Sequence, residues 1–234
     1  MRFLLRGVPW RVLAACLGGW GCPRATPPEA PKAAVQRGKT SMTALDVVPL
    51  ARMKVTQGTL DAEPHGWLVV RTARMRAVVP GLEASRATLR FKLSGPSTEQ
   101  RPLESGELRQ QVGLKLRALD GCNVLYVMWR IAPKPGVVVN YKRNPDMHHS
   151  HDCGNAGYTT VRPSVRHTAR TLAPSLETEH TLRAHLDAGT LRVWADDLLV
   201  WEGTLPSEAL ELEGPVGLRS DNVQLSLQLA VPPS

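Results

Sequence analysis

The chain has 234 residues with 29 Lys and Arg against 21 Asp and Glu, a formal net charge of +8. The excess lies in the N-terminal part, because residues 56–234 hold 20 basic and 19 acidic side chains. We therefore expect no concentrated basic face of the kind that nucleic-acid binding requires, and no apolar run of about 18 residues follows the N-terminus to form a transmembrane helix.

The first 22 residues combine a basic start with a short apolar segment, residues 12–21, directly before Cys22. This arrangement resembles the signal of bacterial lipoproteins, which is removed at a cysteine that becomes lipid-modified. Cys16 is the alternative, since residues 13–16 match the cleavage pattern better, but Arg11 leaves almost no apolar core before them. The resemblance implies an exported protein anchored to the cell envelope through Cys22. A soluble secreted protein with a cleaved signal is the other interpretation.

Residues 23–49 are rich in Pro, Ala and Lys and hold few large apolar side chains. Such a segment cannot offset the entropy lost on ordering. We interpret it as a linker between the anchor and a folded domain at residues 50–234. As a flexible chain it would reach on the order of 30 Å.

From residue 50 onward, short apolar segments alternate with turns rich in Gly, Pro and Asp. The pattern predicts about nine or ten strands and no convincing helix, as in an all-β sandwich. The clearest strand signals before the C-terminal part lie at residues 67–70, 75–79, 87–93, 112–119, 122–131 and 137–141.

Cysteine counting favours removal of the signal at Cys22, because two other cysteines then remain, Cys122 and Cys153. An even pair in an exported domain predicts a disulfide. Cleavage at Cys16 would instead leave Cys22 unpaired.

The segment from His180 to Val231 has the most informative pattern. Two alternating strands meet at Asp196-Asp197, and the sequence Gly-Pro-Val-Gly-Leu at residues 214–218 leads into a final strand. This ending resembles concanavalin-A-like (laminin-G-like) jelly rolls and related sugar-hydrolase-like domains of bacteria, although those usually turn through Asn-Gly or Asp-Gly. The resemblance implies an antiparallel two-sheet jelly-roll sandwich.

The resemblance also implies a lectin-like, carbohydrate-binding role, which some members of the family combine with cleavage. Fold alone does not decide between the two. Retaining glycosidases of this fold carry the strand motif Glu-x-Asp-x-x-Glu, which places two carboxylates about 5 Å apart. That spacing does not occur in this sequence, which argues against this particular chemistry and leaves other glycosidase chemistries open.

Aromatic and basic side chains are the candidates for sugar binding. Along residues 122–131, alternation places Leu125, Val127, Trp129 and Ile131 on one face, which we expect to be core. Tyr126 and Arg130 lie on the other face and are predicted to line a concave ligand surface. The complete set of predicted ligand-binding residues is Tyr126, Arg130, Tyr141 and Asn144. Trp194 and Trp201 are expected to form a cross-strand pair.

A histidine-rich loop is the most unusual local sequence. His148, His149, His151 and Asp152 fall within five residues, and imidazole with carboxylate suits zinc, copper or nickel. The loop also contains Asn, Pro, Gly and Ser, which are typical of an exposed loop. We keep a divalent-metal site there as an alternative and expect no other cofactor.

These observations favour a non-enzymatic binding module for carbohydrate or another cell-envelope ligand. A glycoside-hydrolase-like enzyme of the same fold and a metal-binding domain are the alternatives.

Overall fold

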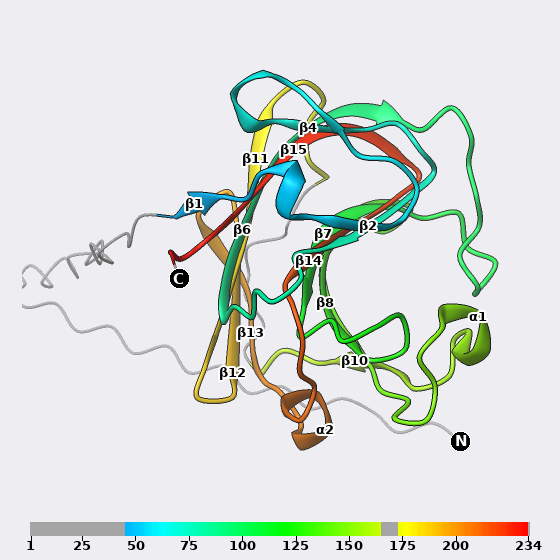
Figure 1. The fold of residues 1–234 in the computed structure, drawn as a ribbon, viewed down its shortest axis with the longest axis vertical. Coiled ribbons are helices and arrows are strands. Elements are labelled where there is room, and N and C mark those ends of the chain that lie inside the picture. Colours follow the sequence, from blue (N-terminus) through cyan, green and yellow to red (C-terminus); the bar gives the residue numbers. More distant parts are fainter. Residues whose placement is uncertain (1–44, 165–172, 234) are drawn as a thin grey trace, which may run out of the picture. The chain divides into compact units, whose positions relative to one another are not determined.

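Two antiparallel β-sheets pack face to face in the computed structural model, which describes residues 45–164 and 173–233 (Figure 1). The predicted all-β, two-sheet antiparallel sandwich is confirmed. Residues 1–22 and most of the linker, including Cys16 and Cys22, lie outside the described residues, so what we expect of them stays a prediction. Within the described part of the chain, no helix is long and apolar enough to cross a membrane.

The larger sheet has eight strands in the order β13-β12-β11-β6-β15-β4-β3, and β1 pairs with β15 outside this path. Its strands are β1 (Asp46–Val47), β3 (Asp61–Ala62), β4 (Leu68–Val70), β6 (Arg86–Pro96), β11 (Glu179–Asp187), β12 (Thr190–Ala195), β13 (Leu198–Thr204) and β15 (Val223–Val231).

The other sheet has seven strands in the order β10-β9-β8-β7-β14-β5-β2. They are β2 (Lys54–Gln57), β5 (Arg74–Val78), β7 (Gln110–Leu116), β8 (Val124–Ala132), β9 (Gly136–Lys142), β10 (Tyr158–Val161) and β14 (Gly217–Asp221). The helical pieces are single turns in connections: η1 (Leu50–Arg52), η2 (Pro64–Gly66), α1 (Ser150–Cys153) and α2 (Ser207–Leu210).

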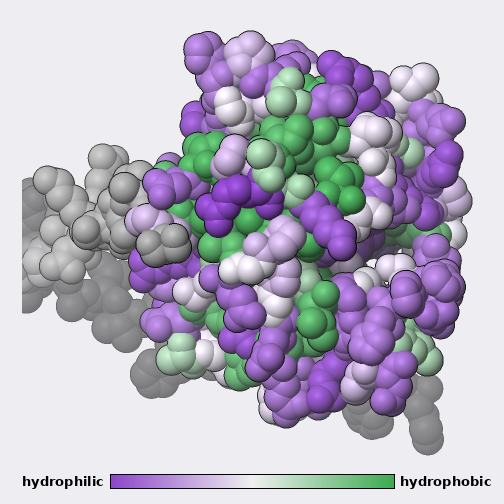
Figure 2. All heavy atoms as spheres, viewed as in Figure 1, coloured by the Kyte–Doolittle hydropathy of each residue, from purple (hydrophilic) through white to green (hydrophobic). Residues whose placement is uncertain are grey.

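The core lies between the two sheets, where alternate side chains of each strand meet. Phe91 of β6 contacts Trp129 of β8 edge to face, with ring centroids 5.6 Å apart. Both side chains belong to the same buried cluster as Leu125, Val127 and Ile131, so the predicted core face of β8 is confirmed. In Figure 2, hydrophobic side chains gather at the centre of the view and hydrophilic ones along its rim.

The sandwich begins before residue 50. β1 pairs Asp46 with Val231, and Val48 is 2% exposed in the core. The C-terminal part of the expected linker therefore belongs to the folded domain.

The expected pairing of Trp194 with Trp201 is wrong. Trp201 pairs with Val193 and Trp194 pairs with Leu199, because a β-bulge shifts the register between Val193 and Trp194. The bulge adds one residue to β13 and reverses the facing of Trp201, which is buried in the core. Trp194 instead carries the Arg183 guanidinium over its ring at 4.8 Å.

The turn between β12 and β13 uses two aspartates where Asn-Gly is common. Asp196 and Asp197 both have positive φ, 48° and 65°, as a two-residue hairpin turn of this kind requires. Asp196 is held there because its carboxylate accepts a hydrogen bond from the Thr181 backbone N–H at 2.8 Å and contacts His180 Nδ1 at 2.7 Å.

Candidate ligand-binding groove

The outer face of the seven-stranded sheet forms the floor of a groove of about 1140 Å³. Its floor comes from β2, β5, β14, β7, β8, β9 and β10. The loop around Glu104 forms one rim and the histidine loop with α1 forms the other. Figure 2 shows the surface hollowed at the right of the view, between two groups of hydrophilic residues.

A buried ionic network lies under the groove at the end of β14. Asp221 is fully buried and pairs with two groove residues, Arg76 of β5 and Arg219 of its own strand, the latter at 2.9 Å. Gln111 of β7 donates a hydrogen bond to it at 2.6 Å. Burial alone would raise the pKa of Asp221, but the Arg219 and Arg76 guanidiniums and the Gln111 hydrogen bond hold it well below its usual range.

Two tyrosines stand beside this network. The rings of Tyr126 on β8 and Tyr158 on β10 stack with centroids 5.9 Å apart and an interplanar angle of 12°. The Arg219 guanidinium lies 4.7 Å from the centroid of the Tyr126 ring and donates a hydrogen bond to the Tyr158 hydroxyl at 3.3 Å. Tyr126 is therefore fixed in place, whereas Tyr158 is 39% exposed and offers its ring to the groove.

Two further cations face the groove without a polar partner. Lys115 of β7 is 5% exposed, and its ammonium group makes no hydrogen bond or ion pair within residues 45–164 and 173–233. Burial and the nearby Arg76 and Arg219 lower the pKa of Lys115 to about 8. Arg130 of β8 has a buried Nε with no hydrogen-bond partner in the described part of the chain, and burial and Arg109 lower its pKa.

The groove is strongly cationic. Its described lining contains two carboxylates, Glu104 and Asp120, against eight basic side chains: Lys54, Arg74, Arg76, Arg109, Lys115, Arg130, Lys142 and Arg219. The expectation of no concentrated basic face is therefore wrong. Strands distant in sequence bring these cations together on one face, while carboxylates elsewhere balance the total charge.

The predicted Cys122–Cys153 disulfide is confirmed, and it fixes the histidine loop to the turn before β8. Asp120 accepts hydrogen bonds from the backbone N–H groups of Cys122 and Asn123. The Asn123 amide in turn donates to the backbone carbonyls of Asn144 and Met147, each at 3.0 Å. This rim is thus held both covalently and by buried polar contacts.

The opposite rim is held by Asn222, the residue between β14 and β15. Asn222 is fully buried and has a φ of 56°. Its side chain accepts a hydrogen bond from the Arg101 N–H at 2.7 Å and donates to the carbonyls of Arg101 and Arg109. β14, which carries Arg219 and Asp221, is therefore followed directly by Asn222, the residue that positions the loop around Glu104.

Tyr126 and Arg130, two of the four predicted ligand-binding residues, line the groove. The prediction is wrong for Tyr141, which pairs with Leu125 on the inner face of the sheet and belongs to the core. Asn144 does not line the described groove either, and its role in ligand binding stays a prediction. That side chain donates hydrogen bonds to the carbonyls of Cys122 and Ala156 and so supports the rim from below.

The candidate metal ligands are divided between two places. His148 contacts Asp120 at 2.8 Å, whereas His149 and His151 contact Asp152 at 3.5 and 3.0 Å. Among the residues that the structure describes, no group of three or more His, Cys, Asp or Glu side chains has an arrangement that could hold a metal ion. Metal binding by this loop stays a prediction.

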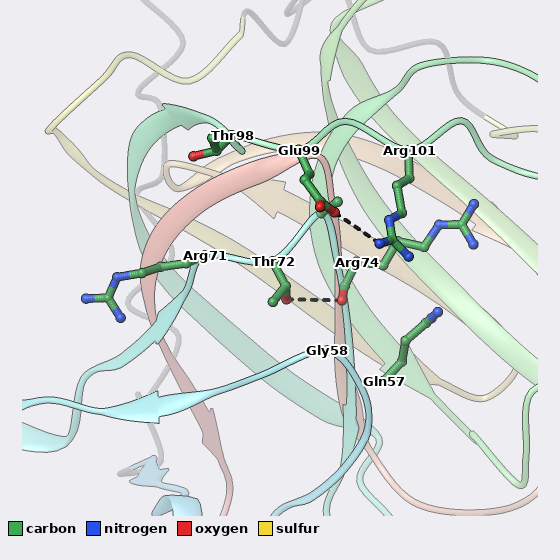
Figure 3. A pocket seen from close by; sticks show the side chains of 9 residues that line it. Gln57, Gly58, Arg71, Thr72, Arg74, Thr98, Glu99 and Arg101 are labelled. Carbon is green, nitrogen blue, oxygen red and sulfur yellow. Dashed lines mark hydrogen bonds and ion pairs between the residues drawn. The ribbon is translucent and has the colours of Figure 1, made fainter.

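A smaller hollow of about 460 Å³ adjoins the groove and shares Gln57 and Arg74 with it (Figure 3). Two contacts join its lining residues to one another: Arg101 pairs with Glu99 at 3.0 Å, and the Thr72 hydroxyl donates to the Arg74 carbonyl at 3.2 Å. We assign it no separate role.

Sequence reasoning missed the cationic floor of Arg76, Lys115 and Arg219. Alternation alone carried a partial signal, because Arg76 and Lys115 each lie between two apolar residues of a predicted strand, whereas Arg219 lies between Leu218 and Ser220. Their convergence depends on the order of β5, β14 and β7 in the sheet, which no local pattern specifies.

Comparison of the sequence with protein-family models and with curated proteins finds no match. Among solved structures, the fold is similar to the carbohydrate-binding module CBM66 from Bacillus subtilis, with a TM-score of 0.52 and 12% sequence identity over 75% of this chain and 91% of that one. A laminarinase from Flavobacterium sp. UMI-01 aligns with a TM-score of 0.46 and 11% identity over 80% of this chain and 95% of that one. The likeness to the first shows the fold, a jelly-roll sandwich of the concanavalin-A-like type.

Proposed function

We propose that the chain is an exported, lipid-anchored carbohydrate-binding module whose groove on the seven-stranded sheet holds a saccharide. The observation that carries the proposal is the groove itself, in which hydrogen-bonding side chains surround a pair of stacked tyrosines. The solved structure reported above as similar in fold is itself described as a carbohydrate-binding module, which supports this choice of ligand class.

The groove suits part of a polymer better than a small molecule. Its volume of about 1140 Å³ exceeds the roughly 300–1,000 Å³ of typical small-molecule pockets. Thr160 and Asn140 form a hydrogen-bonded pair on its floor, and Tyr158 presents an exposed ring. Hydroxyl, amide and aromatic groups on one surface match the alternating polar and apolar faces of sugar rings.

The proposal is binding without turnover. Of the two carboxylates that line the described groove, Asp120 accepts hydrogen bonds from Cys122 and Asn123 and contacts His148. Asp221 is buried below the floor between two arginines. Glu104, the other lining carboxylate, is 65% exposed and pairs with Arg74 at 3.9 Å, on the rim opposite Asp120. We therefore propose no acid and base pair of the kind that sugar hydrolysis needs in the described groove.

Affinity measurement against a panel of soluble polysaccharides tests the proposed function. We expect at least one polysaccharide to bind saturably, and Tyr158→Ala to weaken that binding about tenfold, as loss of an aromatic anchor typically does. Trp194→Ala, on the outer face of the other sheet, is the matched control and should bind like the wild type. Equal losses in both variants, or no binding by the wild type, would reject the groove as a saccharide site.

A further inference from the structure

We propose that the groove selects acidic polysaccharides, and that Lys115 and Arg130 bind the carboxylate or sulfate groups of the ligand. This inference rests on the proposed carbohydrate-binding function and adds the chemical class of the ligand. It follows from the charge of the groove and from the lack of partners for these two side chains.

The charge imbalance persists when nearby carboxylates are included. Asp221 and Glu107 do not line the groove but pair with its arginines. With these two added to Glu104 and Asp120, the eight basic side chains that line the described groove face four carboxylates. A neutral saccharide would leave this excess uncompensated, whereas an acidic one would neutralise it.

Lys115 is the strongest single observation. The Lys115 residue is 5% exposed, and burial removes enough water from its ammonium group to lower its pKa, whereas a buried cation normally has a partner. The charged and titratable groups that face Lys115 are Arg76 of β5, Arg219 of β14, Asp120 and its cross-strand neighbour Tyr126. Two of them are cations and Asp120 is already engaged with other groups, so a ligand anion would be the missing partner.

Arg130 adds a second cation on the neighbouring strand. Its Nε is buried without a hydrogen-bond partner among the described residues, and Arg130 lines the groove. Guanidinium groups bind carboxylate and sulfate-like anions through two parallel hydrogen bonds. Lys115 and Arg130 together could therefore contact successive charged units of one polymer.

Nucleic acids carry the same sign of charge but fit this surface less well. Reading of duplex DNA requires a protruding element that enters a groove, and this site is a hollow. Single-strand sites combine cations with several aromatic platforms. In the described lining, the aromatic residues apart from histidine are Tyr126 and Tyr158, and these stack on each other.

Matched pairs of probes separate charge from backbone. We would measure affinity for polygalacturonate and its fully methyl-esterified form, and for dextran sulfate and dextran, by calorimetry at low salt. We expect each acidic polymer to bind at least tenfold more tightly than its neutral counterpart. A single-stranded DNA of equal charge is included, and binding as tight as that of the acidic polysaccharides would overturn the proposal in favour of a site for polyanions in general.

Variants assign the effect to Lys115. Lys115→Met should lower affinity for the tighter acidic polymer at least tenfold and, because it removes a buried charge without a partner, should raise the melting temperature. Arg183→Gln makes the same charge change on the outer face of the other sheet and should leave affinity unchanged. Lys115→Arg keeps the positive charge at this position. It is the variant to compare with the wild type if Lys115→Met does not fold.

The dependence of ligand affinity on pH distinguishes a Lys115 that binds the ligand anion from a Lys115 that only supports the fold. An anion raises the pKa of Lys115 on binding, so affinity should fall up to tenfold per pH unit as pH rises above the free-state pKa of about 8. In Lys115→Arg the fall should be smaller, and what remains comes from Lys142, which also lines the groove and whose pKa is lowered by burial and Arg219. A wild-type profile as flat as that of the variant would reject the role of Lys115.

The outcomes also separate this inference from the function on which it rests. If neutral and acidic polymers bind equally well, the groove is a saccharide site without charge selectivity, and only the inference fails. If no polysaccharide binds, charged or neutral, the carbohydrate-binding function fails as well.

Discussion

At the scale of single residues, the groove depends on charges of two kinds. Arg76 and Arg219 share one buried counterion, Asp221, so they support the fold and also line the groove. Lys115 and Arg130 have no such counterion in the described part of the chain. We therefore expect substitutions of the first kind to reduce stability and those of the second kind to reduce binding.

Asp221→Asn should destabilise the fold by about 3–5 kcal/mol, because removal of one partner leaves buried guanidiniums without a counter-charge. Urea unfolding at neutral pH measures this. Asp61→Asn is the matched control, since Asp61 and its partner Arg71 are both about 60% exposed and such pairs contribute about 1 kcal/mol or less.

The stability lost in Asp221→Asn should also depend on pH. Because the folded-state pKa of Asp221 is lowered, its stabilising contribution is present above the unfolded-state pKa of about 3.9 and is lost as pH falls below that value. The difference in the free energy of unfolding between the wild type and Asp221→Asn should therefore become smaller as the pH is lowered. A gap that stays constant between pH 7 and pH 2 would contradict this account of the ion network.

At the scale of elements, the alternation of apolar and polar residues predicted well which face of a strand is buried. It predicted poorly which residues of neighbouring strands pair. β8 presents Trp129 to the core and Tyr126 to the groove, as its sequence indicates. Both faces of β9 are largely buried, so its composition did not show that Tyr141 faces inward. The bulge in β13, which reverses Trp201, leaves no mark in a pattern of apolar residues.

The disulfide is the element-scale feature that cysteine counting identified correctly. Replacement of Cys122 and Cys153 by alanine should cost about 3–4 kcal/mol by the loop-entropy model, given a sequence separation of 31. Denaturant unfolding with and without reductant measures this, and the double variant is the control that should not respond to reductant. Unchanged stability of the reduced wild type would show that the polar contacts of Asp120 and Asn123 suffice to hold the rim.

At the scale of the whole molecule, the near balance of 20 basic and 19 acidic residues after position 55 conceals a local excess of one sign. Net charge therefore gave the wrong expectation for this surface, because it does not depend on position. The Arg76–Asp221 contact joins residues 145 positions apart, and only the order of strands in the sheet brings them together. A cleft lined by one sign of charge attracts oppositely charged ligands from a distance.

Membrane attachment is the remaining prediction at this scale. In a bacterial host, Cys22→Ser should move the protein from the membrane fraction to the soluble exported fraction and abolish incorporation of labelled fatty acid. Cys16→Ser is the matched control and should remain attached. If Cys16→Ser is the variant that releases the protein, the alternative processing site is the correct one.

The position of the last two strands has a consequence for biosynthesis. β14 lies between β7 and β5 in one sheet, and β15 lies between β6 and β4 in the other. Until residues 217–231 have left the ribosome, the early strands of both sheets lack their central neighbours, and such long-range pairings form slowly. The nascent chain therefore cannot complete either native sheet before these residues are synthesised, and the earlier strands of both sheets wait without their central neighbours.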